Sequence, residues 1–209
     1  MSFSVDKILV LSPHTDDGEF GCGGAIARFV KEGKEVHYAA FSIAEDSVPE
    51  PFPRDILAKE VEEATEVLGV KSLTVSPYPV RRLAFYRQEI LEKLVRLNEE
   101  IDPDLVFMPS LNDIHQDHTT VAHEGLRAFK KKTILCYELP WNNLNFTNSC
   151  FITFGTEELY KKTRAMGCYE SQKWRGYTTP TFIESLAVTR GTQIGADLAE
   201  VFEVLRLVI

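Results

Sequence analysis

The sequence predicts one α/β domain with a Rossmann-like, mostly parallel sheet that is covered by helices on both faces. Short apolar runs alternate along the chain with amphipathic segments of helical length, an order typical of parallel sheets. The first run, Ile8–Leu11, is apolar at every position, as expected for a strand buried on both faces. The right-handed crossover rule then gives a Rossmann-like topology. The 209 residues contain no linker, repeat or low-complexity tract, so we expect a single domain over residues 1–209.

The first half of the chain contains three strand–helix units. The strand at Ile8–Leu11 is broken by Pro13, and a glycine-rich turn leads into a helix at Cys22–Lys31. Further strands are expected at Glu35–Ser42, Ser72–Ser76 and Asp104–Met108. Helices are expected at Arg54–Leu68 and Tyr86–Glu100, where apolar residues recur at helical spacing, and Gly69 is placed to end the first of these.

The second half continues the alternation. A helix is expected at Thr119–Lys130, then a strand at Thr133–Glu138 and an Asn-rich loop over residues 141–149. The last third is expected to contain a strand at Cys150–Phe154, helices at Glu157–Met166 and near Thr181–Thr189, and a final strand at Ala199–Val208.

Composition excludes several classes of protein. The formal charge is −8, from 23 basic and 31 acidic residues, so nucleic-acid binding is not expected. No apolar run approaches the roughly 20 residues that span a bilayer, and residues 1–6 are too short and polar for a signal peptide, so we expect no membrane insertion and a cytoplasmic location. The four cysteines are widely separated and are expected to be small buried side chains. The sequence leaves the oligomeric state open, homo-oligomers included.

Two polar clusters carry the chemistry. His14, Asp16 and Asp17 follow the first strand, and Asp113, His115, Asp117 and His118 follow the strand at residues 104–108. Both lie after strands of one parallel sheet, so we expect them to meet at its carboxyl edge. His37 and His123 lie outside the clusters and are expected to serve packing or the surface.

Histidine and carboxylate without cysteine suit a catalytic divalent ion, because three protein ligands leave a position open for water. A carboxylate beside the ion can take the proton of that water. The alternative is a dinucleotide-binding glycine turn. Gly21 and Gly23 fit the GxGxxG pattern, but Ile26 occupies its third glycine position, and such a turn would not explain the histidines.

These residues resemble the signature motifs of the LmbE/PIG-L-like family of zinc-dependent N-acetylglucosaminyl deacetylases. The first motif is His14-Thr-Asp-Asp17 with the following Gly-x-Gly-Gly, and the second is His115-Gln-Asp-His118 preceded by Asp113. Weaker similarity covers nearly the whole chain, in residues 60–69, 169–172 and 190–200. The resemblance implies a Rossmann-like fold and a hydrolase that removes acetyl from an N-acetylated amino sugar, free or conjugated.

The resemblance also implies roles for individual residues. His14, Asp17 and His118 would bind Zn²⁺, with Fe²⁺ or Co²⁺ as alternatives. Asp16 would be the general base, and His115 would stabilise the oxyanion or protonate the leaving amine. Asp113 and Asp117 would contact the histidines without binding the metal ion, and would fix the tautomers of the rings.

The sequence departs from the family pattern at two positions. Thr15 replaces the usual proline, and Leu57 replaces an arginine, so that Arg54, Arg81 or Arg82 is the candidate for binding substrate. Two other functions remain open: a metal-dependent amidase or esterase for another small acylated molecule, and a non-catalytic metal- or sugar-binding domain.

Overall fold

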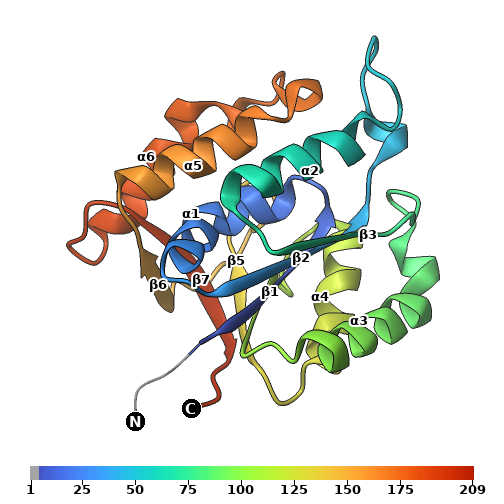
Figure 1. The fold of residues 1–209 in the computed structure, drawn as a ribbon, viewed down its shortest axis with the longest axis horizontal. Helices are drawn as coiled ribbons and strands as arrows, with labels where there is room; N and C mark the ends of the chain where they lie inside the picture. The colour runs from blue at the N-terminus through green and yellow to red at the C-terminus, as the bar shows by residue number, and fades with distance from the viewer. Residues whose placement is uncertain (1–4) are drawn as a thin grey trace.

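A computed structural model describes residues 5–209, and these form one seven-stranded sheet between two layers of helices (Figure 1). The strand order within them is β3-β2-β1-β4-β5-β7-β6. Strands β1 to β5 pair in parallel, whereas β7 is antiparallel to both β5 and β6. This confirms the predicted Rossmann-like, mostly parallel sheet. The strands are β1 (Lys7–His14), β2 (Glu35–Ser42), β3 (Ser72–Val75), β4 (Leu105–Pro109), β5 (Thr133–Tyr137), β6 (Cys150–Thr153) and β7 (Ala199–Arg206).

Helices cover both faces of the sheet. Ile8 and Val10 of β1 point into one core, and Leu9 and Leu11 point into the other. Both faces of the strand are therefore buried, which explains its unbroken apolar run. Helices α1, α2, α5 and α6 lie on one face, and α3 and α4 lie on the other (Figure 1). Their bounds are α1 (Asp17–Lys31), α2 (Ile56–Leu68), α3 (Arg87–Ile101), α4 (Gln116–Ala128), α5 (Thr156–Gly167) and α6 (Pro180–Thr192).

The glycine-rich segment is helical, so the prediction of a turn before a helix at Cys22 was wrong. Helix α1 begins at Asp17 and contains the glycines, with a kink at Cys22, where φ is −145°. A Cβ atom on Gly21 would come within 2.3 Å of the ring of Tyr137. The glycines therefore let the helix backbone lie directly on tyrosine side chains of the sheet, a packing demand that the sequence pattern does not reveal.

A buried ion pair satisfies backbone groups that the kink in α1 leaves free. The Glu200 carboxylate accepts hydrogen bonds of 2.8 Å from the N–H groups of Gly24 and Ala25. Lys162 donates to the carbonyl of Phe20 and pairs with Glu200 at 2.7 Å. Buried backbone groups need such partners, so strand β7 and helix α5 together stabilise the irregular helix.

Two other boundaries differ from the prediction and concern the site. Pro13 does not end β1, which continues to His14 and pairs there with Ser42 of β2. Helix α4 begins at Gln116 rather than Thr119, which puts Asp117 and His118 in its first turn. The predicted helix end at Gly69 is confirmed, with the glycine in the left-handed region at φ 81°.

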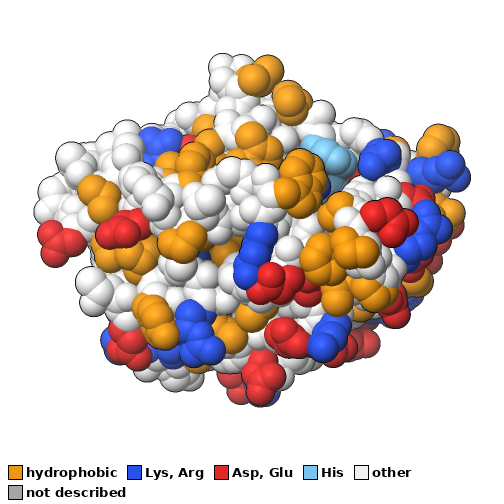
Figure 2. All heavy atoms as spheres, turned by 90° about the horizontal axis from the view of Figure 1, so that it is seen from above, with side chains coloured by type: hydrophobic (Ala, Val, Ile, Leu, Met, Phe, Trp, Pro, Cys, Tyr) orange, Lys and Arg blue, Asp and Glu red, His pale blue; other side chains and the backbone are white. Residues whose placement is uncertain are grey.

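The remaining expectations concern cysteines and membranes. Cys22 and Cys136 are buried as expected, Cys150 and Cys168 are half-buried, and all four are free thiols. No helix in residues 5–209 is both long and apolar enough to cross a bilayer. Figure 2 shows one face of the molecule, on which acidic and basic side chains are interspersed with small groups of hydrophobic ones.

Candidate metal site

The two polar clusters meet at the point in the sheet where the order of the strands reverses, between β1 and β4. Strand β1 lies between β2 and β4, so the chain runs outward from β1 on both sides. His14 is the last residue of β1, and the segment that contains Asp113 and His115 connects β4 to α4. Ligands of open α/β sheets bind at this kind of switch point. Residues about a hundred positions apart are thereby brought together at the carboxyl edge, as predicted.

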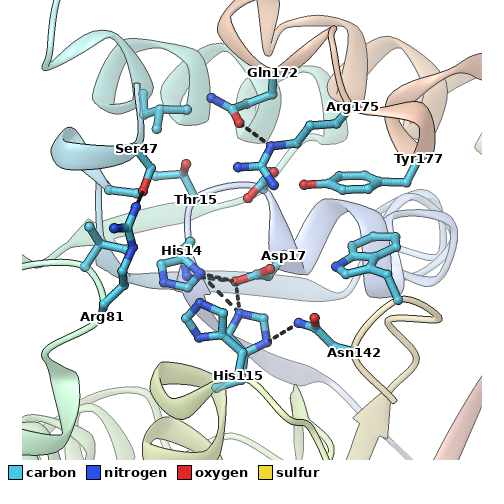
Figure 3. Close-up of a pocket in the computed structure, with 16 residues that line it drawn as sticks. His14, Thr15, Asp17, Ser47, Arg81, His115, Asn142, Gln172, Arg175 and Tyr177 are labelled. Atoms are coloured by element: carbon cyan, nitrogen blue, oxygen red, sulfur yellow. Dashed lines mark hydrogen bonds and ion pairs between the residues drawn. The ribbon is translucent and has the colours of Figure 1, made fainter. Parts of the chain in front are cut away.

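Three side-chain atoms converge at the centre of the site (Figure 3). Oδ2 of Asp17 lies 3.2 Å from Nδ1 of His14 and 3.2 Å from Nε2 of His118. The two histidine nitrogens are 3.1 Å apart. Ligands bonded to zinc at 2.0–2.1 Å in a tetrahedron lie about 3.4 Å from one another, so this donor set has the size that a small divalent ion requires.

Carboxylates behind the two histidines set their tautomers. Nδ1 of His118 lies 2.8 Å from Oδ2 of Asp113, and Nε2 of His14 lies 3.0 Å from Oδ2 of Asp117. Each carboxylate accepts the ring proton on its side, so the opposite nitrogen of each ring is the one directed at the centre. This is the arrangement by which outer carboxylates orient metal-binding histidines. Burial lowers the pKa of His118, but Asp17 and Asp113 outweigh it and raise this pKa to about 10, so a metal ion that binds here displaces a proton.

His115 adds a third imidazole with a different environment. It precedes the first residue of α4, and its Nδ1 accepts the N–H of Asp117 at 3.2 Å, so its proton resides on Nε2. Burial and the neighbouring His14 and His118 lower the pKa of His115 to about 4. His115 is therefore a neutral hydrogen-bond donor at pH 7. Together with His14 and His118 it forms a group that could hold a metal ion, with donor atoms within 4.8 Å of one another.

The adjacent carboxylates Asp16 and Asp17 have opposite electrostatic environments. Burial disfavours ionised Asp17, but the contacts from His118 and His14 outweigh it and hold its pKa well below the usual value. Burial and the charge of Asp17 raise the pKa of Asp16, and Arg175 partly offsets this. Asp17 is thus a permanent anion, whereas Asp16 has the raised basicity of a group that accepts protons.

The loop before α3 is tied to the site through Asp117. This carboxylate accepts the backbone N–H groups of Arg81 and Leu83 in addition to its contact with His14. Arg81 has φ of 64°, in the left-handed region that non-glycine residues seldom adopt. The strained backbone directs the Arg81 N–H at Asp117, while its guanidinium donates to Ser47 at 3.0 Å.

A cavity of about 240 Å³ opens over the donor cluster. Its walls come from several elements, and Figure 3 shows Arg81 and Arg175 on opposite sides, with Tyr177 beside Arg175. Arg175 and Tyr177 were not predicted as wall residues, because the segment 173–177 has no pattern that connects it to the polar clusters. The side chains that complete the walls are Thr15, Ala44, Ser47, Leu57, Val80, Trp141, Asn142, Gln172, Arg175 and Tyr177.

The three arginines predicted as substrate-binding candidates lie in different places. Arg81 lines the cavity, whereas Arg54 and Arg82 are not among its lining residues. The side chain of Arg54 is 76% exposed and pairs with Asp46 at 2.8 Å. His123 is exposed, as expected, and its Nδ1 contacts the carbonyl oxygen of Thr119.

The fold and the site define a Rossmann-like protein with a buried histidine–carboxylate cluster beneath a small cavity. The family model described as PIG-L, GlcNAc-PI de-N-acetylase, matches residues 9–129, which is more than half of the chain. The chain therefore belongs to this family, and the matched region contains both polar clusters.

Curated relatives of the chain include two deacetylases. A probable N-acetyl-α-D-glucosaminyl L-malate deacetylase 2 of Bacillus cereus is 24% identical over 140 residues, which cover 59% of this chain and 61% of the relative. The diacetylchitobiose deacetylase of Thermococcus kodakarensis is 26% identical over 132 residues, which cover 59% of this chain and 49% of the relative. These alignments therefore span less than two thirds of either relative.

Two other similar proteins are a curated hydratase and a protein of known structure. The 4-oxalmesaconate hydratase of Pseudomonas putida is 27% identical over 133 residues, covering 57% of this chain and 50% of the relative. The crystal structure of the conserved protein TT1542 from Thermus thermophilus has a TM-score of 0.84 and 26% identity, and the match covers 99% of this chain and 97% of that one. The whole described fold thus has a solved counterpart.

Proposed function

We propose that this protein is a metal-dependent hydrolase that removes the acetyl group from an N-acetylated amino sugar. The observation that carries the proposal is the convergence of His14, Asp17 and His118 within 3.2 Å of one another, directly beneath a cavity. Family membership and the two deacetylases among the relatives support an amide of an acetylated amino sugar as the bond that is cleaved.

His14, Asp17 and His118 would hold the ion, and zinc is the first candidate because two imidazoles and a carboxylate are typical catalytic zinc ligands. Fe²⁺ and Co²⁺ bind similar donor sets. When bound, such an ion acts as a Lewis acid and supplies a water of lowered pKa.

The other side chains have separate roles in the proposed reaction. Asp16, whose pKa is raised by burial and by Asp17, accepts the proton of the attacking water. His115 carries its proton on Nε2 and donates a hydrogen bond to the developing oxyanion. Asp113 and Asp117 keep the two metal-binding histidines in the tautomer that binding requires. As the C–N bond breaks, Asp16 returns the proton that it took from the water to the leaving nitrogen, and acetate and the free amine are the products.

The cavity supports a substrate of about one sugar unit. Its volume of about 240 Å³ is slightly below the range of about 300–1,000 Å³ typical of small-molecule sites. Trp141 and Tyr177 stack with centroids 3.8 Å apart and form one wall. Such aromatic rings pack against the apolar face of a sugar, while hydroxyl groups reach polar side chains.

The first experiment measures acetate release from a panel of N-acetylglucosamine conjugates by zinc-loaded protein. Asp16→Asn should retain zinc while its turnover falls by about two to four orders of magnitude, the usual contribution of a general base. His118→Ala should lose zinc on dialysis. Full turnover by Asp16→Asn would refute the assigned base, and unchanged zinc content in His118→Ala would refute the assigned ligand.

A hydratase is the second candidate, because the Pseudomonas putida hydratase is similar over the same share of the chain as the deacetylases. The same panel separates the two functions when unsaturated dicarboxylates are added. Loss of double-bond absorbance without acetate release from any amide would favour the hydratase, whereas acetate release alone supports the deacetylase.

A further inference from the structure

The position of the Asp16 carboxylate depends on the peptide group that precedes it. Asp16 is the N-cap residue of α1 but makes no side-chain capping bond there, whereas Asp17 contacts two histidine rings at 3.2 Å each. Thr15 lies in the cavity wall (Figure 3), and its carbonyl group belongs to the peptide that joins it to Asp16. Because a peptide group is planar, fixing the carbonyl oxygen of Thr15 also fixes the direction in which the chain enters Asp16.

Two buried tyrosine hydroxyls contact the carbonyl oxygen of Thr15. The Tyr169 hydroxyl lies 2.6 Å from this oxygen, and the Tyr38 hydroxyl lies 3.0 Å from it. Tyr38 belongs to β2, whereas Tyr169 follows α5 and is 154 positions away from Thr15 in the sequence. Both tyrosines are at most 1% exposed, and neither is among the residues that line the cavity. They therefore act on the backbone from the core and cannot touch a substrate.

Tyr169 is the main donor to the Thr15 carbonyl, because Tyr38 has nearer acceptors. The Tyr38 hydroxyl contacts Oε2 of Glu19 and lies 2.8 Å from the hydroxyl of Ser12, both closer than Thr15. The Tyr169 hydroxyl lies 2.8 Å from Oε1 of Glu19, but its contact with the Thr15 oxygen is shorter. A hydroxyl has one proton to donate, so the carbonyl depends mostly on Tyr169.

We propose that Tyr169 is a positioning residue, which acts through the carbonyl group of Thr15 to hold the Asp16 carboxylate where it accepts the proton of the attacking water. The inference rests on the proposed function, which assigns Asp16 as the general base. A displacement of about 1 Å in such a group can cost about a hundredfold in rate. The two histidines of the proposed metal site are held separately, by Asp113 and Asp117, so metal binding should not depend on Tyr169.

The test uses Tyr169→Phe, which removes the hydroxyl and keeps the ring. Acetate release from methyl N-acetyl-α-glucosaminide by zinc-loaded protein gives kcat and KM, and competition with a chelator gives the zinc affinity. The rate is expressed per bound zinc, so that unfolded protein is not counted. We expect kcat to fall by about ten- to a hundredfold, while KM and zinc affinity change by less than about threefold.

Tyr137→Phe is the matched control for the loss of a buried hydroxyl. Tyr137 is as fully buried as Tyr169, and its hydroxyl donates to the carbonyl of Leu11 in β1 at 2.9 Å. Both variants should lose stability in urea, but Tyr137→Phe should keep kcat within about twofold, since its hydroxyl does not contact the peptide that precedes the base.

A double variant tests whether Tyr169 acts through Asp16. Tyr169→Phe should change the residual kcat of Asp16→Asn by less than about threefold, because the hydroxyl has no base to position once Asp16 is replaced. A residue that supports the whole site would instead lower kcat by the same factor in both backgrounds.

Crystal structures of wild type and Tyr169→Phe measure the positioning without a reaction. In the variant the Thr15 carbonyl should rotate and the Asp16 carboxylate should occupy more than one position, while His14 and His118 stay in place. The inference would be overturned by an unchanged kcat in Tyr169→Phe, by an equal loss in Tyr137→Phe, by the same loss in the Asp16→Asn background, or by an unmoved Asp16 carboxylate. Absence of acetate release from every acetylated substrate by wild type would refute the proposed function instead, and the two crystal structures would then decide whether Tyr169 positions Asp16.

Discussion

Nε2 of His14 lies 3.0 Å from Oδ2 of Asp117, a contact between residues 103 positions apart. The same carboxylate accepts the backbone N–H groups of Arg81 and Leu83. One buried side chain therefore connects the end of β1, the first turn of α4 and the loop before α3. The orientation of a proposed metal ligand thus depends on a loop that contributes no ligand itself.

Asp117→Asn should weaken zinc binding by about ten- to a hundredfold, the usual effect of removing a carboxylate behind a metal-binding histidine. The new amide has only one acceptor oxygen, so its NH₂ group faces one of the donors that Asp117 now satisfies. Zinc affinity measured by competition with a chelator checks this. Asp55→Asn is the control, since Asp55 is exposed and its side chain makes no capping bond. Equal affinities in wild type and Asp117→Asn would contradict the orienting role.

Gly21→Ala should lower the free energy of unfolding by about 2–3 kcal/mol or more, because its methyl group would overlap a tyrosine ring. The Tyr137 ring lies 2.3 Å from the position of the new Cβ, and its hydroxyl is held by the carbonyl of Leu11 at 2.9 Å. The control is Gly167→Ala at the end of α5, where a Cβ meets no atom within 4 Å and stability should not fall. Urea unfolding of both variants makes the comparison. Equal stabilities would mean that Tyr137 moves aside freely.

Glu200→Gln should cost about 3–5 kcal/mol, because it leaves the buried Lys162 ammonium without its counter-charge. The neutral amide also cannot accept both backbone N–H groups at the kink as a carboxylate does. The matched control is Glu63→Gln, whose partner Lys59 lies 3.7 Å away on the surface, and its effect should stay within about 0.5 kcal/mol. Similar losses of unfolding free energy in the two variants would show that burial of the Lys162–Glu200 pair does not determine its contribution to stability.

Stability should fall as the pH rises from about 4.5 to about 8, because of Glu19. Burial of this fully enclosed carboxyl raises its pKa from 4.5 to about 8, although Tyr38 and Tyr169 donate hydrogen bonds to it. In that window the folded state retains a proton that the unfolded state has lost, so each further rise in pH favours unfolding, by a total on the order of a few kcal/mol.

Glu19→Gln should flatten that pH dependence, since an amide does not titrate. Urea midpoints of wild type and variant, measured at several pH values between about 5 and 9, provide the comparison. A wild-type midpoint that rises over this range, or a variant with an unchanged slope, would refute the role of Glu19.

The sequence by itself determined the architecture and the location of the site. Runs such as Ile8–Leu11 are apolar because both faces of the strand are buried, and this pattern is local, so it can be read without coordinates. The convergence of His14 with His118 also followed from sequence, because the carboxyl ends of parallel strands share one edge of a sheet. Element boundaries near the site were less accurate, since caps and tertiary contacts extend α1 to Asp17 and α4 to Gln116.

Only the tertiary structure decided what surrounds the donors. Arg175 reaches the cavity because Glu60, more than a hundred residues earlier, holds its loop, and no periodicity encodes that contact. The glycines of α1 looked like a turn, but they are required by the rings of Tyr38 and Tyr137, which come from distant strands. Such contacts depend on how finished elements pack together. The sequence therefore predicts the donors of the proposed metal site, and packing selects the walls that face its substrate.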